Sequence, residues 1–89
     1  MRITLDISLY PLDADYKPVI KSFIRQLKTF SDIELVTNQM STQVRGEFGE
    51  VMSAVNQCME TSMIDNEKVV FVTKCLNGDL EISRLPEIG

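Results

Sequence analysis

The first ten residues constrain the fold most, because apolar and polar side chains alternate strictly along residues 2–10, "RITLDISLY". The apolar positions share one face: Ile3, Leu5, Ile7 and Leu9. The polar positions share the other: Thr4, Asp6, Ser8 and Tyr10. A period of two is typical of a strand with one buried face. Pro11 has no N–H for a ladder, so we expect the strand to end there.

Two further segments show the helical period. Apolar residues recur every three or four positions in residues 15–30 and again in about 47–62, which predicts two amphipathic helices. Asp13 or Asp15 is the expected N-cap of the first helix. Pro18 then falls in its first turn, where a missing N–H costs little.

Shorter apolar segments predict the remaining strands. Residues 33–36 and 41–44 form two of them, joined by a turn in which Asn38 is expected to accept a positive φ. Residues 68–76, "KVVFVTKCL", form another, because they are rich in β-branched side chains. Asn77 and Gly78 then give a strong hairpin signal, so residues 80–85 are expected as a short extra strand.

This order of elements is β-α-β-β-α-β, with an extra C-terminal strand. It predicts an α+β ferredoxin-like sandwich, in which two helices cover one face of a four-stranded antiparallel sheet. The chain length favours a single domain, which we place at residues 1–85, with a frayed tail at 86–89.

An apolar run marks the predicted fourth strand. Residues 69–72 are valine or phenylalanine throughout, so one face of this strand must carry apolar side chains outward. An exposed apolar strip is typical of an interaction surface, and a second copy is the simplest partner. We therefore expect a homodimer or a homotetramer.

The composition excludes several kinds of function. A net charge of −4 argues against a nucleic-acid-binding surface. The chain has no histidine, and its two cysteines lie far apart, so we expect neither a metal site nor a His-based catalytic pair. No phosphate-binding loop or nucleophile elbow is present in the sequence. We therefore expect no enzyme, no catalytic residues and no cofactor.

The sequence shows no targeting signal that we recognise. The N-terminal apolar stretch is interrupted by Asp6, which argues against a signal peptide. No window approaches the roughly 18 apolar residues of a membrane span. The expectation is a cytoplasmic protein that does not insert into membranes.

One stretch of the sequence carries more polar side chains than a turn requires. Residues 37–47, "TNQMSTQVRGE", offer hydroxyl and amide groups between an apolar strand and an apolar helix. Gln43 can both donate and accept hydrogen bonds. The simpler interpretation is a turn and the start of a strand, and the alternative is a site for a small ligand.

Two motifs together resemble a known family. They are "ISLYPL", residues 7–12, and "TNQMSTQVRGEFGEVM", residues 37–52. This pair is similar to the YkoF and thiamine-binding-protein family, over about residues 1–75. The resemblance implies a ferredoxin-like domain without known catalysis. It implies binding of thiamine or its hydroxymethylpyrimidine part in vitamin uptake or salvage, with a functional link to a transporter of thiamine or its precursor.

By position, the resemblance places ligand-binding candidates on the first strand, in the turn and on the third strand: Ser8, Tyr10, Thr37, Asn38, Met40, Ser41, Thr42 and Gln43. Asp6 joins them, since a mid-strand carboxylate under a covering partner needs a cation or hydrogen bonds. The thiazolium ring of thiamine is such a cation, and Tyr10 could also contact it through its ring.

Two alternatives remain from the sequence. One is an oligomeric regulatory or interaction domain of the same fold, which binds another metabolite or a protein. The other is a small enzyme of the same fold, such as an acylphosphatase-like or isomerase-like dimer. Acylphosphatase chemistry requires an arginine in a glycine-rich loop, and residues 10–16, "YPLDADY", contain neither glycine nor arginine.

Overall fold

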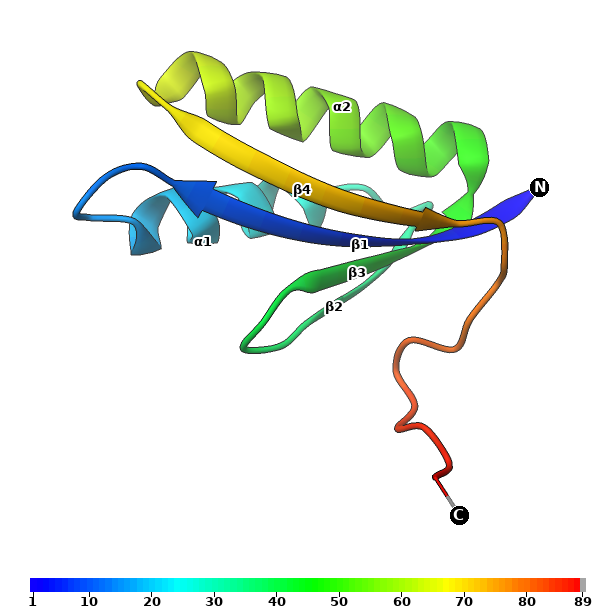
Figure 1. Cartoon of the computed structure of the whole chain (residues 1–89). Helices are drawn as coiled ribbons and strands as arrows, with labels where there is room; N and C mark the ends of the chain where they lie inside the picture. Colours follow the sequence, from blue (N-terminus) through cyan, green and yellow to red (C-terminus); the bar gives the residue numbers. More distant parts are fainter. Residues whose placement is uncertain (89) are drawn as a thin grey trace.

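The computed structural model describes residues 1–88, which form a sheet covered by two helices (Figure 1). The elements follow in the order β1 (Arg2–Pro11), α1 (Lys17–Leu27), β2 (Glu34–Thr37), β3 (Thr42–Glu47), α2 (Phe48–Asp65) and β4 (Val69–Leu76). The sheet is four-stranded with the order β2-β3-β1-β4, and every pairing is antiparallel. The ferredoxin-like α+β fold predicted from the sequence is confirmed.

The core lies between the sheet and the helices. The apolar face of β1 supplies Ile3, Leu5 and Ile7, each almost fully buried. Facing them, α1 buries Phe23 and Leu27, and α2 buries Val51, Ala54, Val55 and Cys58. The Phe23 ring packs against the Phe71 ring of β4, with ring centroids 5.1 Å apart. This packing fixes which face of β4 is covered.

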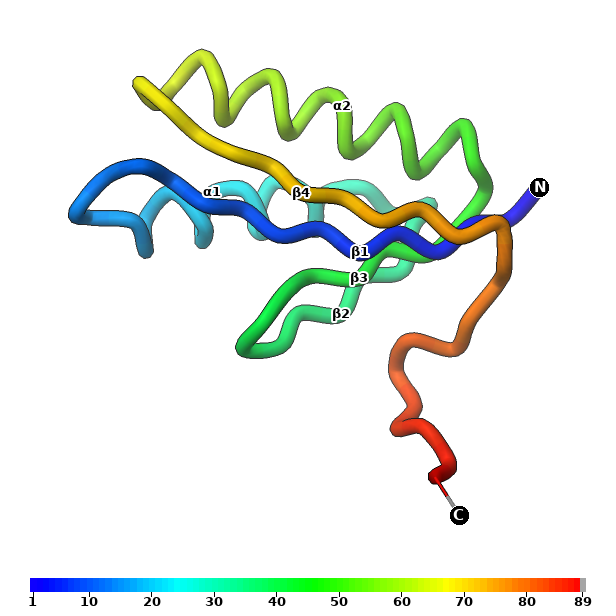
Figure 2. The backbone as a smooth tube through the Cα atoms, viewed as in Figure 1, coloured from blue at the N-terminus to red at the C-terminus, as the bar shows by residue number. Residues whose placement is uncertain are grey.

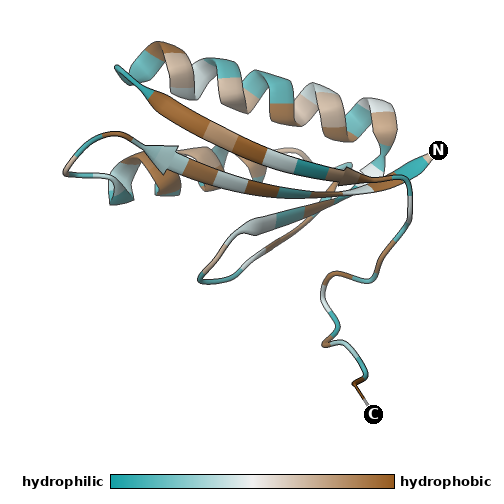
Figure 3. Ribbon diagram, viewed as in Figure 1, coloured by the Kyte–Doolittle hydropathy of each residue, from teal (hydrophilic) through white to brown (hydrophobic). Residues whose placement is uncertain are grey.

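The other sheet face carries no helix, and we call it the open face. It includes Asp6, Ser8 and Tyr10 of β1, as the alternation predicts. In the register of the strands, Ser8 is opposite Val72 and Tyr10 is opposite Val70. Because Phe71 points into the core, these two valines point outward, and both are exposed. Figure 3 shows the resulting apolar bands along β4.

Helix α1 is shorter than expected, and its predicted cap is wrong. It begins at Lys17, and its N-cap is Tyr16, which makes no side-chain capping bond. The Asp13 carboxylate instead accepts a hydrogen bond from the backbone N–H of Asp15, within the preceding turn. Pro18 does lie in the first turn, as predicted.

The turn between β2 and β3 forms without a left-handed residue. No residue that the structure describes, Asn38 included, has a positive φ, so that expectation is wrong. The Asn38 side-chain oxygen instead accepts hydrogen bonds from the backbone N–H groups of Met40 and Ser41, at 2.9 and 3.1 Å. The Asn38 side chain thus stabilises the turn, which needs no residue with a positive φ.

The predicted C-terminal strand is also wrong. Residues 80–85 form no strand, and no hairpin forms at Asn77 and Gly78. After β4 the chain instead crosses the end of the open face, where Thr4 Oγ1 donates to the Gly78 carbonyl oxygen and accepts from the Leu80 N–H. The chain then leaves the sheet (Figure 2). Residues 86–88 are exposed without regular structure, and Gly89 of the predicted tail lies outside the described residues.

Asp79 strengthens this crossing. Its carboxylate accepts from Arg45 Nε of β3 at 2.7 Å and pairs with Arg2 Nε of β1 at 3.0 Å. We call the set Arg2, Thr4, Arg45 and Asp79 the C-terminal clasp. It links the chain after β4 to two strands of the sheet, which explains why Thr4 is buried on a face that no helix covers.

No helix within residues 1–88 is both long and apolar enough to cross a bilayer.

Candidate functional site

The candidate site begins with a hydrogen-bonded cluster on the open face. Asp6 of β1 lies opposite Gln43 of β3 in the strand register. The hydroxyl of Ser41 donates to Asp6 Oδ1 at 2.6 Å, and the Gln43 amide nitrogen donates to the same oxygen at 3.0 Å. That amide nitrogen also lies 2.8 Å from the Ser41 hydroxyl oxygen. Three predicted candidates therefore meet in one cluster.

The cluster holds Asp6 in its ionised form. The hydrogen bonds from Ser41 and then from Gln43 lower the pKa of the Asp6 carboxyl group, and partial burial opposes them. Lys74, which lies opposite Asp6 on β4, also lowers this pKa through its charge. Both hydrogen bonds use Oδ1, and no side chain in residues 1–88 donates to Oδ2. A fixed, charged acceptor oxygen is therefore free to meet a ligand.

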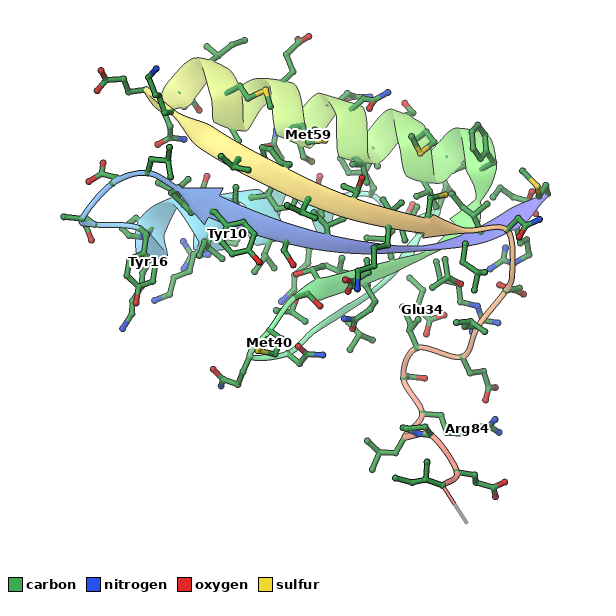
Figure 4. All side chains as sticks on the ribbon, viewed as in Figure 1. Tyr10, Tyr16, Glu34, Met40, Met59 and Arg84 are labelled. Carbon is green, nitrogen blue, oxygen red and sulfur yellow. The ribbon has the colours of Figure 1, made fainter. Side chains whose placement is uncertain are left out.

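A hollow lies beside this cluster on the open face. Its volume is about 360 Å³, and the residues that line it are Asp6, Ser8, Tyr10, Met40, Ser41, Val72 and Lys74. We call it the open-face hollow. Figure 4 shows two of its apolar side chains, Tyr10 projecting from β1 and Met40 from the tip of the β2–β3 hairpin. Apolar contacts beside a few fixed polar groups are typical of sites for small ligands.

Thr37 and Thr42 do not belong to this hollow. Their hydroxyl oxygens lie 3.0 Å apart, and Thr42 is buried opposite Ile7, on the side of the sheet that faces the helices. They line a smaller hollow of about 110 Å³ between the hairpin and α1, whose apolar wall includes Phe23. The sequence-predicted candidates are therefore divided between the two sides of the sheet.

The tip of the β2–β3 hairpin borders the hollows on both sides of the sheet. Ser8, Met40 and Ser41 line both the open-face hollow and the smaller one. Asn38 borders only the smaller one, and its side-chain oxygen already holds the turn. Asn38 therefore acts by placing Met40 and Ser41 and not through a free acceptor of its own.

The sequence did not identify two residues of the open-face hollow, Val72 and Lys74. Both lie on β4, where the consecutive apolar residues gave no clear alternation. Tyr16 and Ile20 were also not identified. They line a neighbouring hollow of about 280 Å³ together with Tyr10 and Met40. The spacing of Val70, Val72 and Lys74 would have indicated the first pair, once Phe71 was assigned to the core.

Comparison with known proteins bears on the family of this chain. The sequence model described as the YKOF-related family matches residues 2–80. The chain belongs to the YKOF-related family. A search of curated proteins finds no match.

Solved structures share the fold. A protein from Streptococcus pneumoniae has 24% sequence identity and a TM-score of 0.82, and the match covers 93% of this chain and 94% of that one. A Thermotoga maritima protein, provisionally assigned to thiamine biosynthesis or salvage, has 19% identity and a TM-score of 0.75, over 97% and 90% of the two chains. A domain of unknown function from Bacillus cereus has 18% identity and a TM-score of 0.74, over 93% and 85%. At these identities the comparison shows the fold alone.

Proposed function

We propose that this protein is a non-catalytic, cytoplasmic binding protein for thiamine or its hydroxymethylpyrimidine moiety, and that it acts in vitamin B1 uptake or salvage. The observation that carries the proposal is the ionised Asp6 carboxylate at the edge of the open-face hollow. Family membership and the provisional thiamine assignment of the Thermotoga maritima structure support the ligand class.

The chemistry of the hollow fits an aminopyrimidine. The free oxygen of Asp6 can accept a hydrogen bond from the exocyclic amino group, and a charged acceptor makes the stronger kind of bond. Ser8 offers a hydroxyl for the ring nitrogens. Gln43 holds the Asp6 carboxylate in place through its hydrogen bond to Oδ1. Tyr10, Met40 and Val72 provide apolar surface for the ring. Asp6 and the Tyr10 ring also suit the positive charge of a thiazolium group.

The same arrangement supports binding without catalysis. Asp6 is held below its usual pKa, which makes it a poor proton acceptor near neutral pH. The Ser41 hydroxyl donates a hydrogen bond to that carboxylate, whose lowered pKa makes it too weak a base to activate the serine as a nucleophile. We therefore assign Asp6 the role of a fixed acceptor and the serine the role of holding it.

Calorimetric titration tests the proposal. Thiamine and hydroxymethylpyrimidine are titrated separately into the wild type and into Asp6→Asn and Gln43→Ala variants. Loss of a hydrogen bond to a charged group costs about 1.5–3 kcal/mol, so Asp6→Asn should weaken binding by roughly 10- to 100-fold. Gln43→Ala should weaken it less, because Ser41 still holds the carboxylate.

The matched control is Gln57→Ala. Gln57 is an exposed glutamine of α2, and within residues 1–88 its side chain bonds only to Ser53 on its own helix. This substitution should leave affinity unchanged. If neither ligand binds the wild type at millimolar concentration, the proposal fails, and the regulatory or interaction domain becomes the leading alternative.

A further inference from the structure

Among the exposed large apolar side chains of this chain are two groups that bear on the open face. One lies on the open face, where Tyr10, Val70 and Val72 are 54%, 44% and 49% exposed. The other lies on residues 80–88, which we call the C-terminal arm. Leu80, Leu85 and Ile88 of the arm are 52%, 85% and 92% exposed. Apolar residues so concentrated in a short terminal segment are typical of a segment that docks on a partner.

The C-terminal clasp gives the arm a fixed point of departure. Asp79, the residue before the arm, is held by Arg2 and Arg45 at one end of the open face. From there the chain runs away from the sheet and both helices, and Figure 4 labels Arg84 on this departing segment. The high exposure of Leu85 and Ile88 shows that the arm does not fold back onto its own sheet.

We propose that the arm docks on the open face of a second copy of this chain, while the arm of that copy docks on the first. The exchange is reciprocal and closes on itself, which is the usual symmetry of a homodimer. It places Leu85 and Ile88 against Tyr10, Val70 and Val72. It therefore covers both apolar groups with one contact.

The length of the arm is sufficient for this contact. Residues 80–88, extended at about 3.3 Å per residue, reach roughly 30 Å. The open face from Thr4 to Tyr10 spans roughly 20 Å by the same measure. One arm can therefore run the length of the partner's β1 and β4.

The charges and the sequence pattern of the arm agree with this contact. Lys74 on the open face forms no ion pair within residues 1–88, and Glu87 stands between the two apolar anchors of the arm. The arm also begins with the alternating pattern of a strand, yet it pairs with neither edge strand of its own sheet, β2 or β4. A second copy supplies both a carboxylate for Lys74 and an extended surface for the arm.

One consequence of the exchange rests on the proposed function. The docked arm closes the open-face hollow, in which the ligand is proposed to bind. Val72 and Tyr10 belong both to the hollow and to the docking surface. A ligand in the hollow would then lie between two copies instead of on an open sheet.

Sedimentation velocity without any ligand tests the exchange, so a failure to bind thiamine does not affect it. The wild type should be dimeric at tens of micromolar. A Leu85→Glu variant should weaken association about tenfold or more, as the loss of a central apolar anchor does. Val72→Lys should weaken it similarly from the other side of the contact.

The matched control is Ile64→Glu, which places the same charge on an exposed isoleucine of α2, away from the open face. It should associate as the wild type does. Leu85 is so exposed that its substitution leaves the fold intact, and circular dichroism checks this. A monomeric wild type would overturn the proposal, and so would a Leu85→Glu variant that associates as tightly as the wild type.

Discussion

Asp6 and Asp79 are two carboxylates of the open face that hydrogen bonds hold in their ionised form. Asp6 is held by Ser41 and Gln43 and leaves one oxygen free beside the hollow. Asp79 is held by Arg45 first and Arg2 second, and these bonds lower its pKa to about 2. The first carboxylate is the proposed acceptor for a ligand, whereas the second fastens the chain end to the sheet.

Asp79 should make stability depend on pH in the acid range. Its pKa is about 2 in the folded protein and close to 3.8 when the chain is unfolded. The clasp therefore contributes fully above about pH 4, and its contribution is lost as the pH falls from there towards 2. Because Asp79 lies at the surface, we expect a modest effect.

Thermal unfolding midpoints measured at several pH values check this prediction. An Asp79→Asn variant should be less stable than the wild type at pH 7, and the difference should shrink as the pH falls below 4. Asp13→Asn, on an exposed turn, serves as the control and should follow the wild type. A constant difference between pH 7 and pH 2 would contradict the role of the clasp.

The β2–β3 hairpin is the element that sets the geometry of the site, because Ser41 and Met40 stand at its tip. One side chain, Asn38, holds this turn through two backbone N–H groups. Its oxygen thus controls where the Ser41 hydroxyl lies relative to Asp6. The hairpin and the site should therefore be disturbed together.

Replacing Asn38 with alanine tests this dependence. The variant loses an acceptor for two exposed hydrogen bonds and should be destabilised by about 1 kcal/mol. Urea unfolding of Asn38→Ala is compared with that of Gln39→Ala, an exposed neighbour for which no hydrogen bond occurs in the described structure. Equal stability of the two variants would show that the turn does not depend on the Asn38 side chain.

The helical layer offers a separate test of the core. Leu27 of α1 is completely buried, so Leu27→Ala should leave a cavity and cost about 2–5 kcal/mol. Leu12 is 65% exposed, and Leu12→Ala should change stability by about 0.5 kcal/mol or less. Urea unfolding measures both. A loss below 1 kcal/mol for Leu27→Ala would mean that the core can close around the gap.

The sequence predicts those elements whose signal is local. The alternation in residues 2–10 and the apolar period of the two helices predict β1, α1 and α2, although the ends of the helices differ by a few residues. The extra strand at 80–85 was wrong for a non-local reason. A strand needs a neighbouring edge, and Asp79 takes the chain across the open face before it can return along β4.

The candidate site shows the same limit. Asp6, Ser41 and Gln43 were named from the sequence, and the register brings them together. Thr37 and Thr42 were named with them but lie on the helix side, because the period of two sends neighbouring residues to opposite faces. Lys74 was missed, since it depends on the orientation of β4, which the packing of Phe23 on Phe71 decides.

At the scale of the whole molecule, the open face has two proposed occupants, a small ligand and the arm of a second copy. They share Tyr10 and Val72. If the arm closes the hollow over the ligand, each must favour the other by the same free energy, because binding linkage is reciprocal. The ligand should then tighten the dimer, and the dimer should bind the ligand better.

This reciprocity gives the last prediction. Leu85→Glu, which changes a residue outside the hollow, should weaken thiamine binding as well as dimerisation. Saturating thiamine should lower the dimer dissociation constant of the wild type. Because the pair has two sites, this constant should fall by the square of the factor by which dimerisation raises the thiamine affinity of each site. Sedimentation with and without thiamine, and titrations at low and high protein concentration, measure the two sides of this cycle.

Three results of that cycle have distinct meanings. A dimer that thiamine tightens, together with thiamine affinity that rises on dimerisation, would establish a site completed by two copies. Tight thiamine binding that is the same for the wild type and Leu85→Glu would place the ligand in a site that one chain completes alone, so the closing of the hollow would be wrong. A dimer that thiamine dissociates would mean that arm and ligand compete for Tyr10 and Val72, and the arm would then keep the ligand out of the hollow.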